Sequence, residues 1–324
     1  LALARAAEVG GVHLGFEAAV AGGIPIIKSI KEGLAGNRCS RVYGILNGTC
    51  NFILTAMREG GREFQEVLAE AQVLGYAEAD PTFDVEGIDA AHKLTILASI
   101  AFGIPLQFDK TFTEGITKIT RADVEYAEEL GYRIKHLGFA RRTDEGVELR
   151  VHPTLIPERR LIANVDGVMN AVLVKGDAVG PTLYYGAGAG AEPTASAVVA
   201  DLVDVTRMLT ADPGNRVPHL AFQPGELATT PILPIDDVVT AFYLRLVVAD
   251  KAGVLARITG ILADNDISID AVLQRESAEG ENQTDLIILT HDTVEGRMKA
   301  ALAQMQALPT VLAPIVRIRK EELS

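Results

Sequence analysis

The sequence predicts a soluble α+β protein whose last part is a separate ferredoxin-like domain. In that part, residues 241–248, 267–274, 284–290 and 311–319 have strand patterns, and 253–265 and 294–306 have amphipathic helical patterns. The order βαββαβ is typical of a four-stranded sheet covered by two helices. Before residue 213, alanine-rich helices are mixed with short strands, which favours a mixed sheet with covering helices. At 324 residues, two or three domains are expected.

The first region is predicted element by element. Strands are expected at 12–16, 41–46, 133–140, 147–151 and 182–185, and 165–174 is expected to form a pair of strands with a turn near Gly167 or Met169. Helices are expected at 51–59, 64–74, 88–102 and 194–209. Gly75 and Gly103 each follow an apolar helical run, where glycine commonly ends a helix. Residues 214–236 hold several prolines with little periodicity, which predicts an extended linker.

Charge and composition exclude several classes of function. A net charge of −13 argues against a nucleic-acid partner, because phosphate binding needs a positive field. No apolar run is long enough to cross a bilayer, so no membrane partner is expected. Residues 1–10 are typical of a helix fragment rather than a signal peptide. Cys39 and Cys50 are the only cysteines, which supports neither a disulfide framework nor a zinc site and indicates the cytoplasm.

The polar stretch from Gly75 to Lys93 carries the densest chemistry. Asp89 and Lys93 lie four residues apart on a predicted helix, so they share one face. The rest of that helix is apolar, which predicts a partly buried Lys93, and an amine in such a place can exchange a proton near pH 7. Catalysis and a structural ion pair both remain open. His92 points away from this face and is expected to be structural.

Four acidic residues in the same stretch raise the alternative of a metal site. They are Glu78, Asp80, Asp84 and Glu86. Their spacing matches neither an EF-hand loop nor a histidine-rich transition-metal site. A metal bound by these carboxylates is therefore disfavoured.

A glycine run precedes the predicted helix at 194–209. Gly186-x-Gly188-x-x-Ala191 formally satisfies the relaxed dinucleotide fingerprint, and glycines there let a backbone approach a phosphate or cofactor. However, a proline-rich segment follows the helix instead of a second strand ending in an acid. The glycine run is therefore not expected to be the phosphate-binding turn of a Rossmann fold, whereas cofactor contact and close helix–strand packing both stay possible.

Three ordered motifs resemble those of homoserine dehydrogenases. They are Gly75-Tyr76-x-Glu78-x-Asp80-Pro81 followed by Asp84, Gly87, Asp89 and Lys93; residues 16–27, from Phe16-Glu17 to Ile26-Ile27; and residues 44–53, with Gly48, Thr49 and Asn51. The resemblance implies reversible reduction of L-aspartate 4-semialdehyde to L-homoserine with NADP or NAD as cofactor. A catalytically inactive regulatory protein, or a dehydrogenase acting on another aldehyde, would be the alternatives.

The resemblance also implies a role for each matching residue. Lys93 would donate the proton and Asp89 would position it. The substrate side would be formed by Glu78, which binds the ammonium group, with Asp84, Tyr76, Thr49 and Gly48. Gly190 and Gly188 would contact the cofactor. A sodium-type cation would be bound by the Glu17 side chain and by the backbone carbonyls of Val20, Gly22 and Ile24, although these glycines could simply form a tight turn.

The family has a nucleotide-binding domain whose fingerprint precedes the part matched here. The resemblance therefore implies that residues 1–15 are a remnant of that Rossmann-type domain and that the chain alone would not turn over. Residues 16–213 would be the catalytic domain, with the helix at 194–213 packing back on the nucleotide-binding domain. Residues 214–236 would be the linker, and 237–324 the regulatory domain.

The segment 248–255 joins the first strand and helix of the βαββαβ unit, and this unit resembles an ACT domain. Asp250 is expected to cap the helix, and Gly253 to permit close approach at its start. The candidate effector residues are Asp250, Gly253, Val254, Leu255 and Asn265. Threonine is the expected effector, since homoserine leads to threonine, and a dimerisation module without ligand is the alternative. A homodimer or homotetramer is expected.

Overall fold

The computed structural model describes residues 2–209, 217–275 and 282–323. Its contacts divide the chain into two compact units. The first comprises Leu1–Thr117, His136–His152 and Asn164–Leu233, and the second Lys118–Lys135, Pro153–Ala163 and Pro234–Ser324. Strands β3 (Tyr132–Arg142) and β4 (Val147–Pro157) contribute residues to both units.

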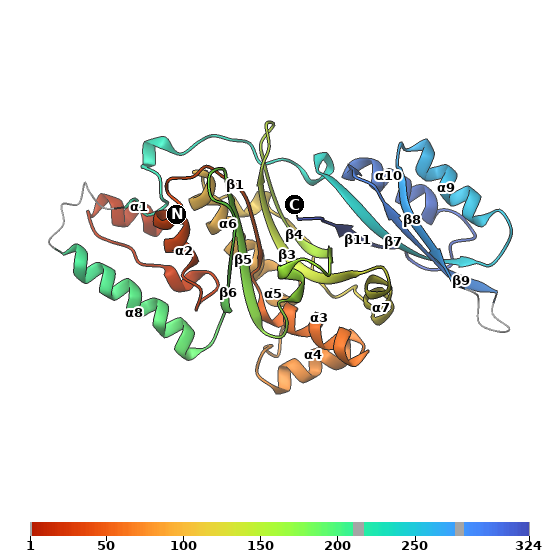
Figure 1. Ribbon diagram of the computed structural model, residues 1–324, viewed down its shortest axis with the longest axis horizontal. Coiled ribbons are helices and arrows are strands. Elements are labelled where there is room, and N and C mark those ends of the chain that lie inside the picture. The colour runs from red at the N-terminus through yellow and green to blue at the C-terminus, as the bar shows by residue number, and fades with distance from the viewer. Residues whose placement is uncertain (1, 210–216, 276–281, 324) are drawn as a thin grey trace. The chain divides into compact units, whose positions relative to one another are not determined.

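A mixed sheet forms the centre of the first unit (Figure 1). Its strands follow the order β6-β5-β1-β3-β4, with β1 at Cys39–Ile45, β5 at Met169–Gly176 and β6 at Gly180–Ala187. The short β2 (Phe112–Thr113) pairs with β4 in parallel. Helix α6 (Ile88–Phe102) packs its apolar residues into the core of this unit, and Gly138 on β3 leaves room for the side chains of Leu46 and Leu94.

The other helices of the first unit surround the site residues. They are α1 (Ala2–Val9), α2 (Ile26–Lys28), α3 (Gly48–Gly60), α4 (Phe64–Val73), α5 (Thr82–Val85) and α8 (Ala191–Met208). Helix α3 is capped by Asn47 and ends at Gly61, whose φ of 57° is the left-handed conformation that glycine allows. Helix α8, green in Figure 1, packs against the short turn Glu17–Ala19.

The second unit contains the predicted βαββαβ arrangement. Its elements are α7 (Arg121–Glu129), β7 (Val239–Ala249), α9 (Val254–Asp264), β8 (Ile269–Gln274), β9 (Gln283–Thr290), β10 (Thr293–Val294), α10 (Glu295–Gln306) and β11 (Val316–Lys320). Strands run antiparallel in the order β11-β7-β9-β8, and one apolar core includes Phe242, Ile258 and Met298. The α+β class and the ferredoxin-like arrangement are confirmed.

Two predicted strand regions were wrong. Residues 12–16 form no strand: Val12 is exposed, and Gly15 lies against Asp201 of α8 instead of against a strand. Residues 165–174 give only β5, which starts at Met169. The amide of Asn51 binds the carbonyls of Val165, Gly167 and Met169, which a partner strand would otherwise use.

Other predictions agree closely with the structure. Helix α6 has the predicted bounds, and the last strand is shorter than expected, at Val316–Lys320. In the predicted linker, residues 214–216 lie outside the described residues, and the rest is mostly irregular, with Ile232 bridged to Val147. Cys39 and Cys50 are free and buried. No helix in the described ranges is long and apolar enough to cross a membrane.

Candidate active site

Lys93 lies on the second turn of α6 with its ammonium group held in place. Its Nζ donates to Asp89 Oδ2 at 2.7 Å and to the carbonyl oxygen of Leu46, the residue after β1, at 3.1 Å. The side chains of Lys93 and Asp89 are 22% and 20% exposed. An ammonium group has three N–H donors, and the described residues take two. The remaining donor is therefore available to a ligand.

Asn47 connects this ion pair to a second acid, and the sequence analysis did not assign it to the site. Its Nδ2 donates to Asp84 Oδ1 at 2.7 Å and to Asp89 Oδ2 at 2.9 Å, and its Oδ1 accepts the N–H of Cys50 at 2.9 Å. One side chain thus caps α3 and orients two carboxylates. The available signal was an Asn directly before a helix, which predicts the cap but neither of the acidic partners.

Asp84 lies on α5, next to this cluster. Burial raises the pKa of Asp84 above its ordinary value, and the hydrogen bond from Asn47 offsets part of that shift. Asp84 therefore adds a second carboxylate beside Asp89, with the Asn47 amide between them.

The remaining predicted substrate residues lie around the start of α3 and the loop after α4. Thr49 donates its hydroxyl hydrogen to the carbonyl of Tyr76 at 2.6 Å, and the Tyr76 ring packs edge-on against Phe52. Gly48 is the first residue of α3. Glu78 is exposed, and its backbone carbonyl accepts a bond from Gln72. These contacts attach the loop to α3 and α4 while the Glu78 side chain stays at the surface.

The other acids of the loop have local partners. Asp80 accepts bonds from the N–H and hydroxyl groups of Thr82, and Glu86 accepts one from Thr117. In the part of the chain that the structure describes, no group of three or more His, Cys, Asp or Glu side chains could hold a metal ion. His92 stacks on Phe108 at 3.9 Å between ring centroids, as suits a structural role.

The glycine run between β6 and α8 packs against the second motif. A Cβ at Gly22 would lie 3.0 Å from the carbonyl oxygen of Gly188, and the N–H of Gly23 donates to Ala187. Gly190 is the N-cap of α8 with a φ of 118°, a conformation that side chains rarely adopt. Close packing of backbones is therefore one reason for these glycines.

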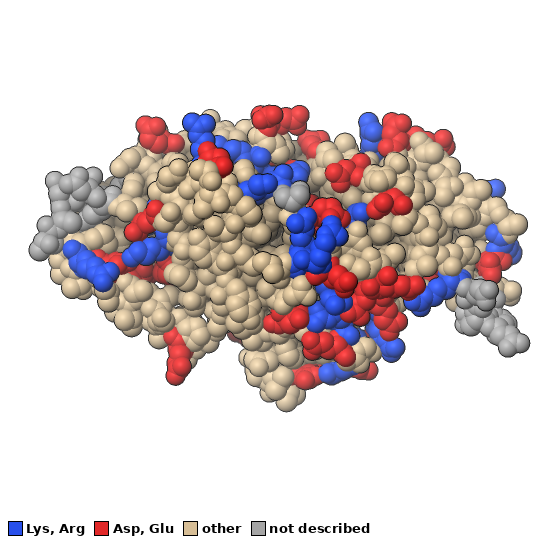
Figure 2. Space-filling model, viewed as in Figure 1, with Lys and Arg blue, Asp and Glu red and all other residues tan. Residues whose placement is uncertain are grey.

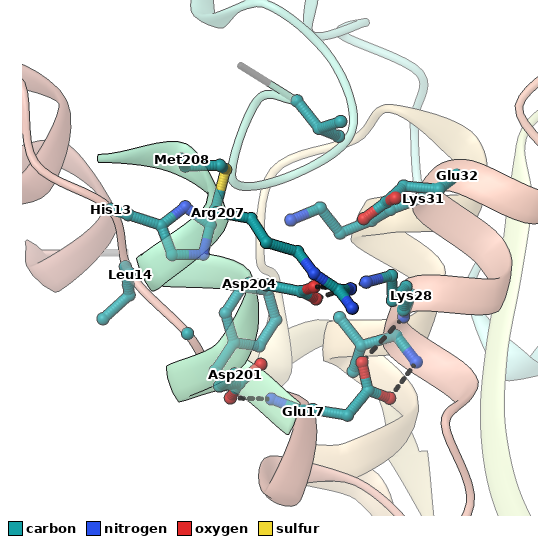
Figure 3. Close-up of a pocket in the computed structure, with 14 residues that line it drawn as sticks. His13, Leu14, Glu17, Lys28, Lys31, Glu32, Asp201, Asp204, Arg207 and Met208 are labelled. Atoms are coloured by element: carbon teal, nitrogen blue, oxygen red, sulfur yellow. Dashed lines mark hydrogen bonds and ion pairs between the residues drawn. The ribbon is translucent and has the colours of Figure 1, made fainter. Parts of the chain in front are cut away.

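Glu17 is buried beside α2, and both oxygens of its carboxylate are already bonded (Figure 3). Oε1 accepts the N–H of Ile27 at 2.8 Å, and Oε2 that of Lys28 at 2.9 Å. Burial raises the pKa of Glu17, and these two bonds partly offset the shift. The carbonyl of Ile24 accepts the N–H of Ile26. Val20 and Gly22 are buried in the same loop.

The predicted effector residues do not all gather at one place. Gly253, with a φ of 88°, is the N-cap of α9, so the expectation that Asp250 caps this helix was wrong. Asp250 lies three residues earlier, and its N–H donates to the carbonyl of Asn282. Val254 is buried and Leu255 exposed at the helix start. Asn265 is the C-cap, at the far end of an 11-residue helix, or about 16 Å away at ~1.5 Å per residue.

Comparison with known proteins identifies the family. The sequence profile of homoserine dehydrogenases matches residues 25–203, and that of the ACT domain matches 242–310. A homoserine dehydrogenase from Pseudomonas aeruginosa is 66% identical over 314 residues, covering 97% of this chain and 72% of the relative. One from Helicobacter pylori is 47% identical over 309 residues, covering 95% and 71%.

Solved structures agree with the sequence matches. The crystal structure of a homoserine dehydrogenase from Thiobacillus denitrificans has a TM-score of 0.93 and 68% identity, covering 99% of this chain and 73% of that one. A hyperthermophilic archaeal homoserine dehydrogenase mutant in complex with NADPH has a TM-score of 0.55 and 28% identity, covering 64% and 60%. This chain therefore belongs to the homoserine dehydrogenase family and has an ACT domain in its C-terminal part.

Proposed function

We propose that Lys93 is the proton donor when L-aspartate 4-semialdehyde is reduced to L-homoserine at this site. The observation that carries the proposal is the Lys93 ammonium, held by Asp89 and by the Leu46 carbonyl with one N–H to spare. That N–H would bond to the aldehyde oxygen and pass its proton to it as the carbonyl carbon is reduced. Asp89 fixes the direction of the amine.

The acids around Lys93 suit a substrate that carries an ammonium group. Glu78 binds this group from the loop surface, and Asp84 contributes a second negative charge nearby. Gly48, Thr49 and Tyr76 line the same pocket, where Thr49 holds the loop in place through Tyr76. An aldehyde without the amino group would lack this electrostatic attraction and bind more weakly.

The cofactor is NADP or NAD, and Gly188 and Gly190 contact it. When bound, the reduced nicotinamide supplies the hydride. Gly190 has no side chain to obstruct the approach, and the N-terminus of the 18-residue α8 favours a negative charge. The archaeal relative in complex with NADPH supports a nucleotide of this class.

A sodium-type cation is proposed at Glu17, Val20, Gly22 and Ile24. The Glu17 carboxylate accepts one backbone N–H at each oxygen, and a carboxylate has about four acceptor positions, so capacity remains for a cation. Carbonyl oxygens suit a hard ion of this kind. The expected result is a higher melting temperature in sodium chloride than in equal choline chloride, lost in Glu17→Gln.

We infer the domain roles from the exposed apolar residues of α8. Val198, Val199 and Leu202 are each about half exposed, which suits a helix at 194–213 that packs on a nucleotide-binding domain. Residues 210–213 of that segment lie outside the described residues. Residues 16–213 would then be catalytic, 214–236 the linker and 237–324 regulatory. Free cysteines suit a cytoplasmic protein.

A homodimer or homotetramer is proposed on the basis of exposed surface that carries few charges. In Figure 2 acidic and basic side chains are interspersed, but the area over β5 and β6 carries few of them. Tyr185, on β6, is 59% exposed. Aromatic surface with few charges is typical of subunit contacts. Light scattering of wild type and Tyr185→Glu measures the assembly, and Tyr185→Glu is expected to weaken it.

The ACT domain is proposed to bind threonine through the turn that starts α9. Asp250, Gly253, Val254 and Leu255 lie together there, and the glycine lets a ligand approach the backbone N–H groups. Asn265 lies at the far end of α9. It would contact threonine only if the ligand bound at that end, or if a second copy of the chain brought its own Asn265 to the ligand.

One assay tests the catalytic proposal. The full-length protein is given NADPH with L-aspartate 4-semialdehyde, and in parallel with succinic semialdehyde, which lacks the amino group. NADPH oxidation with the first and at least about tenfold lower kcat/KM with the second is expected. No oxidation with either would favour an inactive regulatory protein. Equal activity would remove Glu78 and Asp84 from substrate recognition.

A further inference from the structure

Asn170 is a buried polar residue that the roles above leave unexplained. It is the second residue of β5, pairs with Gly186 of β6, and is 1% exposed. A Cβ at Gly188 would lie 2.1 Å from Asn170 Cγ and Nδ2, so the amide occupies the space that the missing side chain leaves. A Cβ at Gly48 would lie 3.6 Å from Asn170 Oδ1. The amide therefore lies between the start of α3 and the glycine run.

The Oδ1 atom of Asn170 is buried and has no hydrogen-bond partner among the residues that the structure describes. Burying an amide oxygen in this way is unfavourable, because its hydrogen bonds with water are lost and not replaced. Asn51 shows the contrasting structural case, since its Nδ2 donates to three backbone carbonyls. Asn170 thus lacks the bonds expected of an amide kept for stability alone.

The position of the Asn170 oxygen suggests which group supplies its missing hydrogen bond. Gly48 and Thr49 are proposed to line the substrate pocket, and Gly188 and Gly190 to contact the cofactor. Asn170 lies beside one residue of each pair, on the side where a Cβ of Gly48 or Gly188 would point, which places it where the two reactants would meet. An amide oxygen accepts hydrogen bonds, so the missing partner is a donor.

We propose that Asn170 Oδ1 accepts a hydrogen bond from an N–H group of a bound reactant and so positions it for reduction. The donor is an N–H of the substrate's ammonium group or of the cofactor's carboxamide, which offer the same chemistry. Gly188 serves this role by leaving space for the amide. The inference rests on the proposed function and adds a positioning residue to it.

The test compares Asn170→Ala and Gly188→Ala in the full-length enzyme. The first removes the acceptor, and the second displaces it, because the new Cβ takes the place of the amide. We expect both to raise the KM of one reactant at least about tenfold while the KM of the other changes less than about threefold. An effect on the semialdehyde identifies the ammonium as the donor, and an effect on NADPH identifies the carboxamide.

Thr182→Ala is the matched control, because it removes one side-chain bond, to the Val174 carbonyl, from the same β5–β6 hairpin. It should lower the melting temperature slightly and leave both KM values unchanged. If Asn170→Ala behaves like Thr182→Ala, or if neither KM moves more than twofold in Asn170→Ala and Gly188→Ala, the oxygen binds only a structural water and the proposal is overturned. An inactive wild type would instead overturn the proposed function.

Discussion

Helices α6 and α9 both begin after a glycine with a positive φ, but the residues around the two helix starts differ. Gly87 and Gly253 are their N-caps, with φ values of 82° and 88°, and neither helix start has a side-chain cap. In α6 the first turn contains Asp89, already bonded to Lys93 and Asn47. In α9 the first turn contains no acid and is largely exposed.

The difference fits the two roles proposed above, proton donation at α6 and effector binding at α9. A proton donor must be held in position before the substrate arrives, so the polar partners of α6 are supplied by the protein itself. An effector site must gain its partners from the ligand, so the backbone at the start of α9 stays open. The predictions below change one region at a time.

Replacing Lys93 should have the largest effect. Lys93→Ala removes the proposed proton donor and should lower kcat at least about 100-fold in steady-state kinetics of the full-length enzyme. Lys110→Ala is the matched control, since Lys110 is an exposed lysine bonded to Gln107. A decrease smaller than about threefold in Lys93→Ala would remove Lys93 from the role.

Replacing Asn47 should affect both stability and activity. Asn47→Ala loses the cap of α3 and the bonds to Asp84 and Asp89, so urea unfolding should show a loss of about 2 kcal/mol and kcat should fall roughly tenfold. Asn47→Asp keeps the cap but places a third carboxylate beside the other two. If Asn47→Asp is as active as the wild type, the bridging amide does not position the acids.

His136 should make the first unit less stable in acid. It lies against Gly87, and burial lowers its pKa from 6.5 to about 4. Between these pH values the unfolded chain binds a proton that the folded chain does not, so stability falls as the pH falls from about 6.5 towards 4.

The expected slope from His136 is at most about 1.4 kcal/mol per pH unit. The free energy of unfolding, measured by urea titration across this range, should depend less on pH in His136→Gln by about that amount. An unchanged slope would show that the imidazole is protonated in the folded state.

The last prediction concerns the start of α9. Gly253→Asp places a side chain at a φ of 88°, which costs about 1 kcal/mol or more, and adds a charge beside the open N–H groups. Threonine binding, measured by calorimetry on the full-length protein, should weaken at least about tenfold. Gly260→Asp is the control on the same helix, because a Cβ there meets open space. Equal threonine affinities in both variants would locate the effector elsewhere.

Much of the fold could be predicted because the spacing of apolar residues along the sequence indicates individual helices and strands. Helix α6 has an apolar run closed by Gly103, and its observed bounds equal the predicted ones. Asp89 and Lys93 were expected to meet because they are four residues apart on that helix. The errors arose where a distant group replaced a local partner. The carbonyls of Val165 and Gly167 accept bonds from Asn51 instead of from a strand, and Gly15 lies against Asp201 of α8.

The sequence by itself determined helices α3, α4, α6 and α8, the βαββαβ order and the Lys93–Asp89 pair, because each depends on spacing along a continuous stretch of chain, whereas α7 was not predicted. Tertiary structure alone decided that Asn47 bridges two acids, that the Leu46 carbonyl holds Lys93, and that Asn170 fills the space beside Gly188. These contacts join residues up to 47 positions apart or on separate strands. No local pattern specifies these contacts, because they form only when the sheet brings the ends of strands β1, β5 and β6 together.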